Sequence, residues 1–174
     1  MNTNTVRDLA SRILLVVGGI GMLAGAVDPL EGSIVILAGS LLMALGTFLG
    51  PKEHRLLAFR IWVFMLIAIG VGALWGLSMV GGIGGKSGHS MWWGLLILPY
   101  LIGWSLGLWG PGSPRWLSVG GIVVGLWYLI LMAMVVRHAS RPGGAWPGII
   151  MAIVGVVTIG GCLSRLLRRI PRQP

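Results

Sequence analysis

The chain has 174 residues, of which 56% are hydrophobic and only 10% are charged, and its formal net charge at pH 7 is +9. Soluble domains carry about 25% charged residues, so the composition excludes a domain with an ordinary water-facing surface. Apolar runs of roughly twenty residues, the length of a membrane-crossing helix, recur along the chain. We therefore expect an all-α, polytopic membrane protein that forms a single transmembrane domain over residues 1–174.

Six apolar segments predict six transmembrane helices. A membrane β-barrel is excluded because its strands would alternate polar and apolar residues, whereas these segments are apolar throughout. In chain order, the expected helices cover residues 9–27, 30–49, 57–80, 91–109, 116–136 and 147–167.

Turn-forming residues separate these segments. We expect Asp28 to be the N-cap of the second helix, with Pro29 at its first position and Glu31 at its third. Gly50-Pro51 and Gly110-Pro111 predict the ends of the second and fourth helices. Glycine accepts the left-handed conformation of a C-cap, and proline cannot continue the helix.

Lysine and arginine are divided unevenly between the two ends of the predicted helices. With the N-terminus inside the cell, three of them (Lys86, Arg137 and Arg141) lie outside and the other ten lie inside. This excess predicts a multi-pass protein of the inner (cytoplasmic) membrane whose N- and C-termini are both cytoplasmic. We expect no nucleic-acid partner, since no segment is long enough to form a soluble basic domain. The ten inner residues are Arg7, Arg12, Lys52, Arg55, Arg60, Arg115, Arg165, Arg168, Arg169 and Arg172.

The segment GGIGGKSGHS, residues 81–90, contains fragments of two catalytic motifs. A phosphate-binding loop would require glycine at position 80, which is Val80 here. An intramembrane serine protease would need a base for Ser87 from a late helix, but the sixth helix contains no histidine and His138 lies at the outer end of the fifth. We interpret the segment as a flexible glycine-rich linker, with Ser90 as the N-cap of the fourth helix.

Candidate ligands for metals and cofactors lie at the ends of the predicted helices. All three histidines are in loops or at helix ends, so none is placed to hold a haem at membrane depth. Asp28 and Glu31 are an alternative cation site, but their spacing is explained by the N-cap, which we favour. The single Cys162 excludes an intramolecular disulfide and a thiolate cluster. We expect no catalytic residue, no cofactor and no metal.

The predicted helices contain no ionisable side chain near their middle. Ion-coupled transporters usually carry one, so the sequence argues against ion or proton coupling within one subunit and leaves a pore between subunits as an alternative. The polar groups at depth are hydroxyls that can bond to their own helix backbone: Ser40, Thr47, Tyr100, Ser105, Tyr128 and Thr158.

Glycine occupies 30 of the 174 positions. Glycines four residues apart let helices approach closely in lipid. We interpret such pairs as sites of helix packing within the chain, with contacts between copies of the chain as the alternative. The pairs inside or at the ends of the predicted helices are Gly21/Gly25, Gly46/Gly50, Gly72/Gly76, Gly103/Gly107 and Gly121/Gly125.

Short repeated motifs indicate three helical hairpins. LASRI at 9–13 returns as LAFRI at 57–61, and GPKEHRLL at 50–57 returns as GPGSPRWL at 110–117. The first hairpin, ILLVVGGIGMLAGAVDPLEGSIVILAGSLLMALGTFLG, and the three-hairpin layout resemble the small bacterial HdeD-type membrane proteins. That family is linked to acid resistance and has no defined catalytic site. The resemblance therefore implies a stress-related membrane protein and transfers no functional residues.

Three functions are compatible with the sequence. For any function we expect the chain to lie in the lipid bilayer, with a homo-oligomer or a larger membrane complex as possible assemblies. The first function, which we favour, is a non-enzymatic accessory, scaffold or stress-related membrane component. The second is a transporter or channel for a small or lipophilic solute, formed by a homo-oligomer. The third is a membrane enzyme that acts at the outer loops through Ser87, His89, His138, Asp28 or Glu31.

Overall fold

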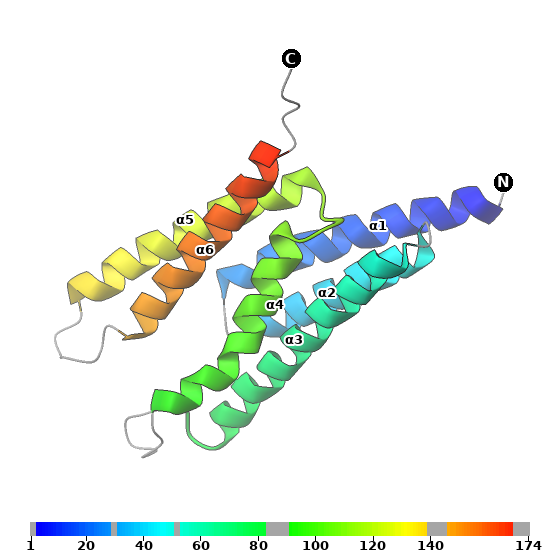
Figure 1. Cartoon of the computed structure of the whole chain (residues 1–174). Helices are drawn as coiled ribbons and strands as arrows, with labels where there is room; N and C mark the ends of the chain where they lie inside the picture. The colour runs from blue at the N-terminus through cyan, green and yellow to red at the C-terminus, as the bar shows by residue number, and fades with distance from the viewer. Residues whose placement is uncertain (1–2, 29–30, 51–52, 83–90, 139–145, 169–174) are drawn as a thin grey trace. The chain divides into compact units, whose positions relative to one another are not determined.

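The computed structural model describes residues 3–28, 31–50, 53–82, 91–138 and 146–168. These residues form helices, and no strand occurs among them, so the all-α fold class is confirmed (Figure 1). The chain divides into two compact units, Met1–Gly107 and Leu108–Pro174. The helices are α1 (Thr3–Ala24), the 3₁₀ turn η1 (Gly25–Val27), α2 (Gly32–Leu49), α3 (His54–Met79), the 3₁₀ helix η3 (Met91–Ile97), α4 (Leu98–Trp109), α5 (Arg115–His138) and α6 (Trp146–Arg168).

Among the residues that the structure describes, four helical stretches are long and apolar enough to cross a membrane. They are Asn4–Val27, Gly32–Leu49, His54–Met79 and Arg115–Met134. Their large apolar side chains point outward to an unusual degree for a protein in water: Trp62 is 69% exposed and Val123 is 62% exposed. The prediction that the chain contains helices long and apolar enough to cross a membrane is confirmed for these four.

The predicted helix over 91–109 is divided into two parts with different geometry. Residues 91–97 form the 3₁₀ helix η3, and the α-helix begins only at Leu98. Pro99 explains the change, because proline has no N–H to donate and its ring clashes with the carbonyl four residues earlier. The 3₁₀ helix rises about 2 Å per residue, so η3 and α4 together still extend for about 30 Å, the thickness of a hydrocarbon core.

The helix ends fall at the predicted Gly-Pro pairs, but by a different mechanism. α2 ends at Leu49 and α4 ends at Trp109. Gly50 has φ −73° and ψ −167°, an extended conformation, and Gly110 is not among the glycines with positive φ. A residue before proline is pushed out of the helical region toward extended geometry, so Pro51 and Pro111 act on the residues that precede them. The expected left-handed caps at Gly50 and Gly110 are therefore wrong.

The antiparallel pair α1–α2 is held by small residues spaced seven apart. A Cβ atom on Gly18 would lie 2.5 Å from the Gly39 carbonyl oxygen, and one on Gly39 would lie 2.6 Å from the Gly18 carbonyl oxygen. Gly25 and Gly32, seven residues nearer the turn, are in still closer backbone contact. Such a repeat keeps the same faces of two gently supercoiled helices in contact along their length.

A further contact between α1 and α2 lies at the end of this helix pair that is farther from the turn. Ser11 Oγ donates a hydrogen bond to the Gly46 carbonyl oxygen at 2.6 Å. The glycine seam, as we call it, is therefore formed by residues 11, 18 and 25 on one side and 32, 39 and 46 on the other, in a single antiparallel register. Large side chains such as Met22, Ile36 and Met43 fill the space beside it.

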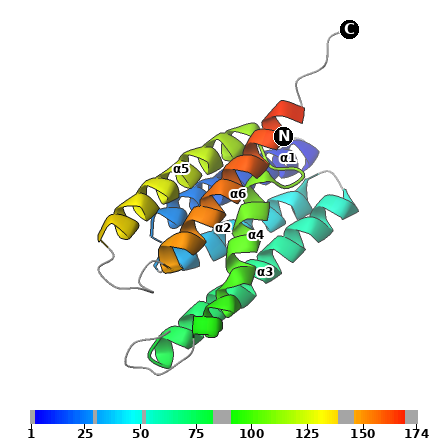
Figure 2. The ribbon, with the colours of Figure 1, turned by 60° about the vertical axis from the view of Figure 1, so that its left-hand side comes forward.

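The next two helices of this unit also meet at glycines. A Cβ atom on Gly103 of α4 would lie 2.9 Å from Leu66 Cβ and from Ile67 Cγ1 of α3, and Gly70 of α3 touches the backbone of Tyr100. Figure 1 shows α4 beside α3 over this stretch. In the second unit, Gly121 and Gly125 of α5 lie against Cys162 and Ile159 of α6, and Figure 2 shows these two helices side by side.

The glycine pairs predicted from the sequence differ in their surroundings. Gly25, Gly46, Gly50, Gly103, Gly107, Gly121 and Gly125 each lie where an added Cβ would come within about 3 Å of a neighbouring atom, and Gly21 makes an ordinary contact of 3.4 Å with Gly39 Cα. Gly72 and Gly76 of α3 have nothing within 4 Å of an added Cβ. The expectation that this pair packs helices within the chain is therefore wrong for the described residues, because this face of α3 points away from its neighbours.

Candidate functional site

The turn between α1 and α2 contains the acidic pair that the sequence singled out. The backbone N–H of Glu31 donates to Asp28 Oδ1 at 3.2 Å, and the N–H of Gly32 donates to the Asp28 carbonyl oxygen at 2.9 Å. Asp28 itself is extended, with φ −121° and ψ 107°. These are the features of an N-cap residue, although the regular α-helix begins only at Gly32. Pro29 lies outside the described residues.

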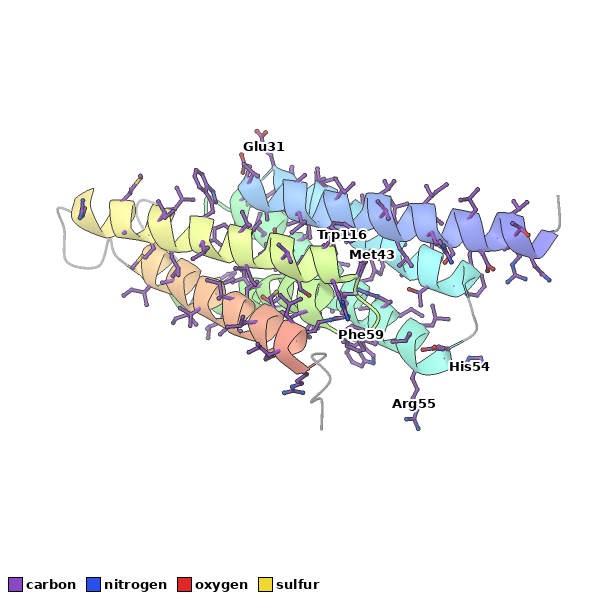
Figure 3. The ribbon with its side chains drawn as sticks, turned by 90° about the horizontal axis from the view of Figure 1, so that it is seen from above. Glu31, Met43, His54, Arg55, Phe59 and Trp116 are labelled. Carbon is purple, nitrogen blue, oxygen red and sulfur yellow. The ribbon has the colours of Figure 1, made fainter. Side chains whose placement is uncertain are left out.

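Glu31 takes a different part in this turn from Asp28. Its backbone is already helical, with φ −70° and ψ −38°, and its side chain makes no capping hydrogen bond. Figure 3 shows the Glu31 side chain pointing away from the α1–α2 pair. Over the part of the chain that the structure describes, no three His, Cys, Asp or Glu side chains come together as metal ligands would. The geometry of this turn therefore favours capping over cation binding.

Several loop residues of interest lie outside what the structure describes. Residues 83–90, which include Lys86, Ser87, His89 and Ser90, belong to this group, as does the side chain of His138. The interpretation of that segment as a linker stays a prediction.

Two of the six hydroxyl side chains named from the sequence, Ser40 and Thr47, donate hydrogen bonds to backbone carbonyls of their own helix, as expected. Ser40 Oγ donates to the Leu37 carbonyl oxygen at 2.8 Å, and Thr47 Oγ1 donates to the Met43 carbonyl oxygen at 2.9 Å. In this way a polar group in an apolar environment avoids the cost of an unmade hydrogen bond.

Two long side chains tie different helices of the first unit together. Trp104 of α4 is 2% exposed, and its Nε1–H donates to the Met22 carbonyl oxygen of α1 at 2.9 Å. Arg60 of α3 is also 2% exposed, and its Nη1 donates to the Gly107 carbonyl oxygen, in the last turn of α4, at 3.3 Å. A cation at a helix C-terminus is favoured by the helix dipole and by the carbonyls that have no partner within the helix.

The burial of Arg60 is the functional feature that the sequence reasoning missed. The charge pattern places Arg60 only among the inner positive charges, and its counterpart in the LASRI repeat, Arg12, is exposed. The available signal was helical spacing: Arg60 lies three and seven residues before Val63 and Ile67, which are 2% and 0% exposed. The guanidinium also lies 5.9 Å from the ring centroid of the adjacent Phe59, which is labelled in Figure 3.

Most of the polar side chains described above act on backbone carbonyls, whereas the buried Ser33 Oγ of α2 accepts a hydrogen bond from Trp75 Nε1–H of α3 at 3.3 Å. Ser11, Ser40, Thr47, Arg60 and Trp104 each donate to a main-chain oxygen. A donor engaged in this way holds helices in register or satisfies a helix end.

Comparison of the chain with protein-family models, with curated proteins and with solved structures finds no match. The resemblance of the first hairpin to the HdeD-type proteins stays a prediction.

Proposed function

We propose that the chain is a non-enzymatic, multi-pass membrane protein that serves as an accessory, scaffold or stress-related component of a membrane. The observation that carries the proposal is the use of its buried polar side chains, exemplified by Arg60 and Trp104, to fasten one helix to the backbone of another. An enzyme or an ion-coupled carrier would keep such groups available for its substrate. Here they support a rigid helical body.

In the proposed arrangement, six spans form three hairpins in the inner membrane, and both termini are cytoplasmic. Two features support insertion in lipid. The seams between helices are made of glycine and serine, the small residues that dominate helix contacts in membranes. The outward faces carry large apolar side chains such as Trp62, Ile69 and Val123, which would be costly in water and are favourable against acyl chains.

A second candidate function has one observation in its favour. The face of α3 that contains Gly72 and Gly76 has open space around both glycines and is flanked by Met65 and Met79, which are 47% and 83% exposed. A second copy of the chain could use these glycines for close approach, and a homo-oligomer of this kind could form a path for a small or lipophilic solute between its subunits.

The mass of the intact complex separates the two candidates. The protein is extracted from its native membrane in mild detergent, and the complex is weighed with and without crosslinking. The proposed accessory role predicts a stoichiometric foreign membrane protein in the complex. A ring of identical subunits without a foreign chain would contradict this role and favour the transporter. Gly72→Leu, which fills the exposed α3 face, should dissociate such a ring, whereas the equivalent change at Gly160, which also has nothing within 4 Å, is the matched control.

A further inference from the structure

Three arginines lie at one end of the second unit. α5 begins at Arg115, and α6 carries Arg165 and Arg168 in its last turn. The two helices are antiparallel, and the contacts of Gly121 with Cys162 and of Gly125 with Ile159 fix their register. The same register places the start of α5 beside the end of α6. Arg115 and Arg168 are exposed and Arg165 is half-buried.

The second unit has no aspartate or glutamate side chain to neutralise this end. All four acidic residues of the chain, Asp8, Asp28, Glu31 and Glu53, lie in its first 53 residues. The unit Leu108–Pro174 therefore contains arginines and neither aspartate nor glutamate. Like charges held close together repel one another, most strongly where apolar surroundings lower the effective dielectric constant. An anion from outside the unit would remove this repulsion.

Two hydrogen-bonding groups lie at the same end, one with an acceptor and one without an acceptor in the part of the chain that the structure describes. Arg165 Nη2 donates to the Ser113 carbonyl oxygen in the loop between α4 and α5. The indole ring of Trp109 lies on Gly161, one helical turn before Arg165, and its buried Nε1–H has no acceptor among the described residues. A buried donor of this kind points to a missing acceptor such as water or an ion. An oxygen-rich anion would both supply acceptors to these groups and offset the charge of the arginines.

We propose that this basic end, formed by Arg115, Arg165 and Arg168 beside Trp109, binds the phosphate group of an anionic phospholipid. Guanidinium groups match the oxygen geometry of a phosphate with paired N–H donors. The end lies where two apolar helices terminate, which is the level of lipid headgroups for helices that cross the bilayer. The proposal requires membrane insertion but does not depend on the non-enzymatic role.

The test uses the full chain in detergent and a lipid titration. Phosphatidylglycerol is added to the purified protein, and the lipid-bound fraction is followed by native mass spectrometry. Arg115→Gln removes one proposed contact, and Arg137→Gln, at the opposite end of the same helix, is the matched control, since Arg137 is also exposed. Each arginine near an anionic lipid contributes about a fivefold change in affinity. We therefore expect the Arg115→Gln/Arg168→Gln double variant to bind about 25-fold more weakly and Arg137→Gln to bind as the wild type does.

Two further titrations identify the source of the phosphate group. Phosphatidylcholine has the same phosphate without net charge and should bind far more weakly than phosphatidylglycerol. Inorganic phosphate alone should neither bind nor displace the lipid. Three results would overturn the proposal. The double variant could bind phosphatidylglycerol as tightly as the wild type, Arg137→Gln could lose as much affinity as the double variant, or inorganic phosphate could displace the lipid completely. Circular dichroism of each variant verifies that the helices are retained.

Discussion

The glycine seam between α1 and α2 makes a prediction that can be worked out from distances. In Gly39→Ala, the new methyl group would lie 2.6 Å from the Gly18 carbonyl oxygen and 2.9 Å from the Met22 backbone nitrogen. An ordinary contact begins at 3.4 Å, so the deficit is about 0.8 Å. Both neighbours are backbone atoms and cannot rotate away. The two helices must therefore move apart, which weakens every contact along the seam.

The expected cost follows from measurements on overpacked cores. Added methyl groups in close-packed interiors cost about 1–3 kcal/mol, and for a protein of this size each kcal/mol lowers the unfolding temperature by about 2–4 °C. Gly39→Ala should therefore unfold roughly 2–12 °C below the wild type in detergent, as followed by circular dichroism. Gly18→Ala, whose methyl would lie 2.5 Å from the Gly39 carbonyl oxygen, should show a similar loss.

Two alanine variants serve as controls for the change of residue itself. In Gly21→Ala the nearest atom outside its own helix is 3.4 Å away, and in Gly72→Ala no such atom lies within 4 Å. Alanine is a better helix former than glycine by about 0.5–1 kcal/mol, so both variants should be as stable as the wild type or slightly more stable. If Gly39→Ala unfolds at the same temperature as Gly21→Ala, the close approach of the two helices at Gly39 is refuted.

Three smaller predictions concern single hydroxyl or carboxyl groups. Ser11→Ala should cost about 0.5–1.5 kcal/mol, because it removes the hydrogen bond to the Gly46 carbonyl oxygen; unchanged denaturation would show that this bond does not contribute. Asp28→Ala should lose about 1 kcal/mol while Asp28→Asn and Asp28→Ser, which still accept the Glu31 N–H, are tolerated with or without chelator; equal damage from Asn and Ala would favour a cation site. Ser87→Ala should leave any cellular phenotype intact, and a null phenotype at normal protein level would contradict the non-enzymatic role.

The sequence predicted the helices well because the signals for them are local. Long apolar runs and Gly-Pro pairs are properties of adjacent residues, and α2 and α4 end where those pairs predict. The sequence signal for the division of the fourth helix into η3 and α4 is also local, since Pro99 lies inside the predicted span. The surrounding apolar run nevertheless predicts one continuous span, because hydropathy averaged over about 19 residues hardly changes at a single proline.

The packing was harder to predict because two spacings coexist among the glycines. Pairs four apart are conspicuous in a glycine-rich chain, whereas the seam depends on glycines at 18, 25, 32, 39 and 46, seven residues apart. Only the second spacing continues through the turn and specifies the antiparallel register. The inward orientation of Arg60 could not be predicted from its charge, because its environment is created by the last turn of α4, 47 residues later in the chain.

The central claim, a six-span membrane protein with both termini in the cytoplasm, is tested most directly by labelling of single cysteines in intact cells. Cys162 is fully buried and is first replaced by alanine to give a cysteine-free chain. A membrane-impermeant maleimide should then label a cysteine at Gly84 or Gly143 from outside, and should label a cysteine at Pro51 only after the cells are opened. Labelling at Pro51 in intact cells, or protection at Gly84, would contradict the proposed topology.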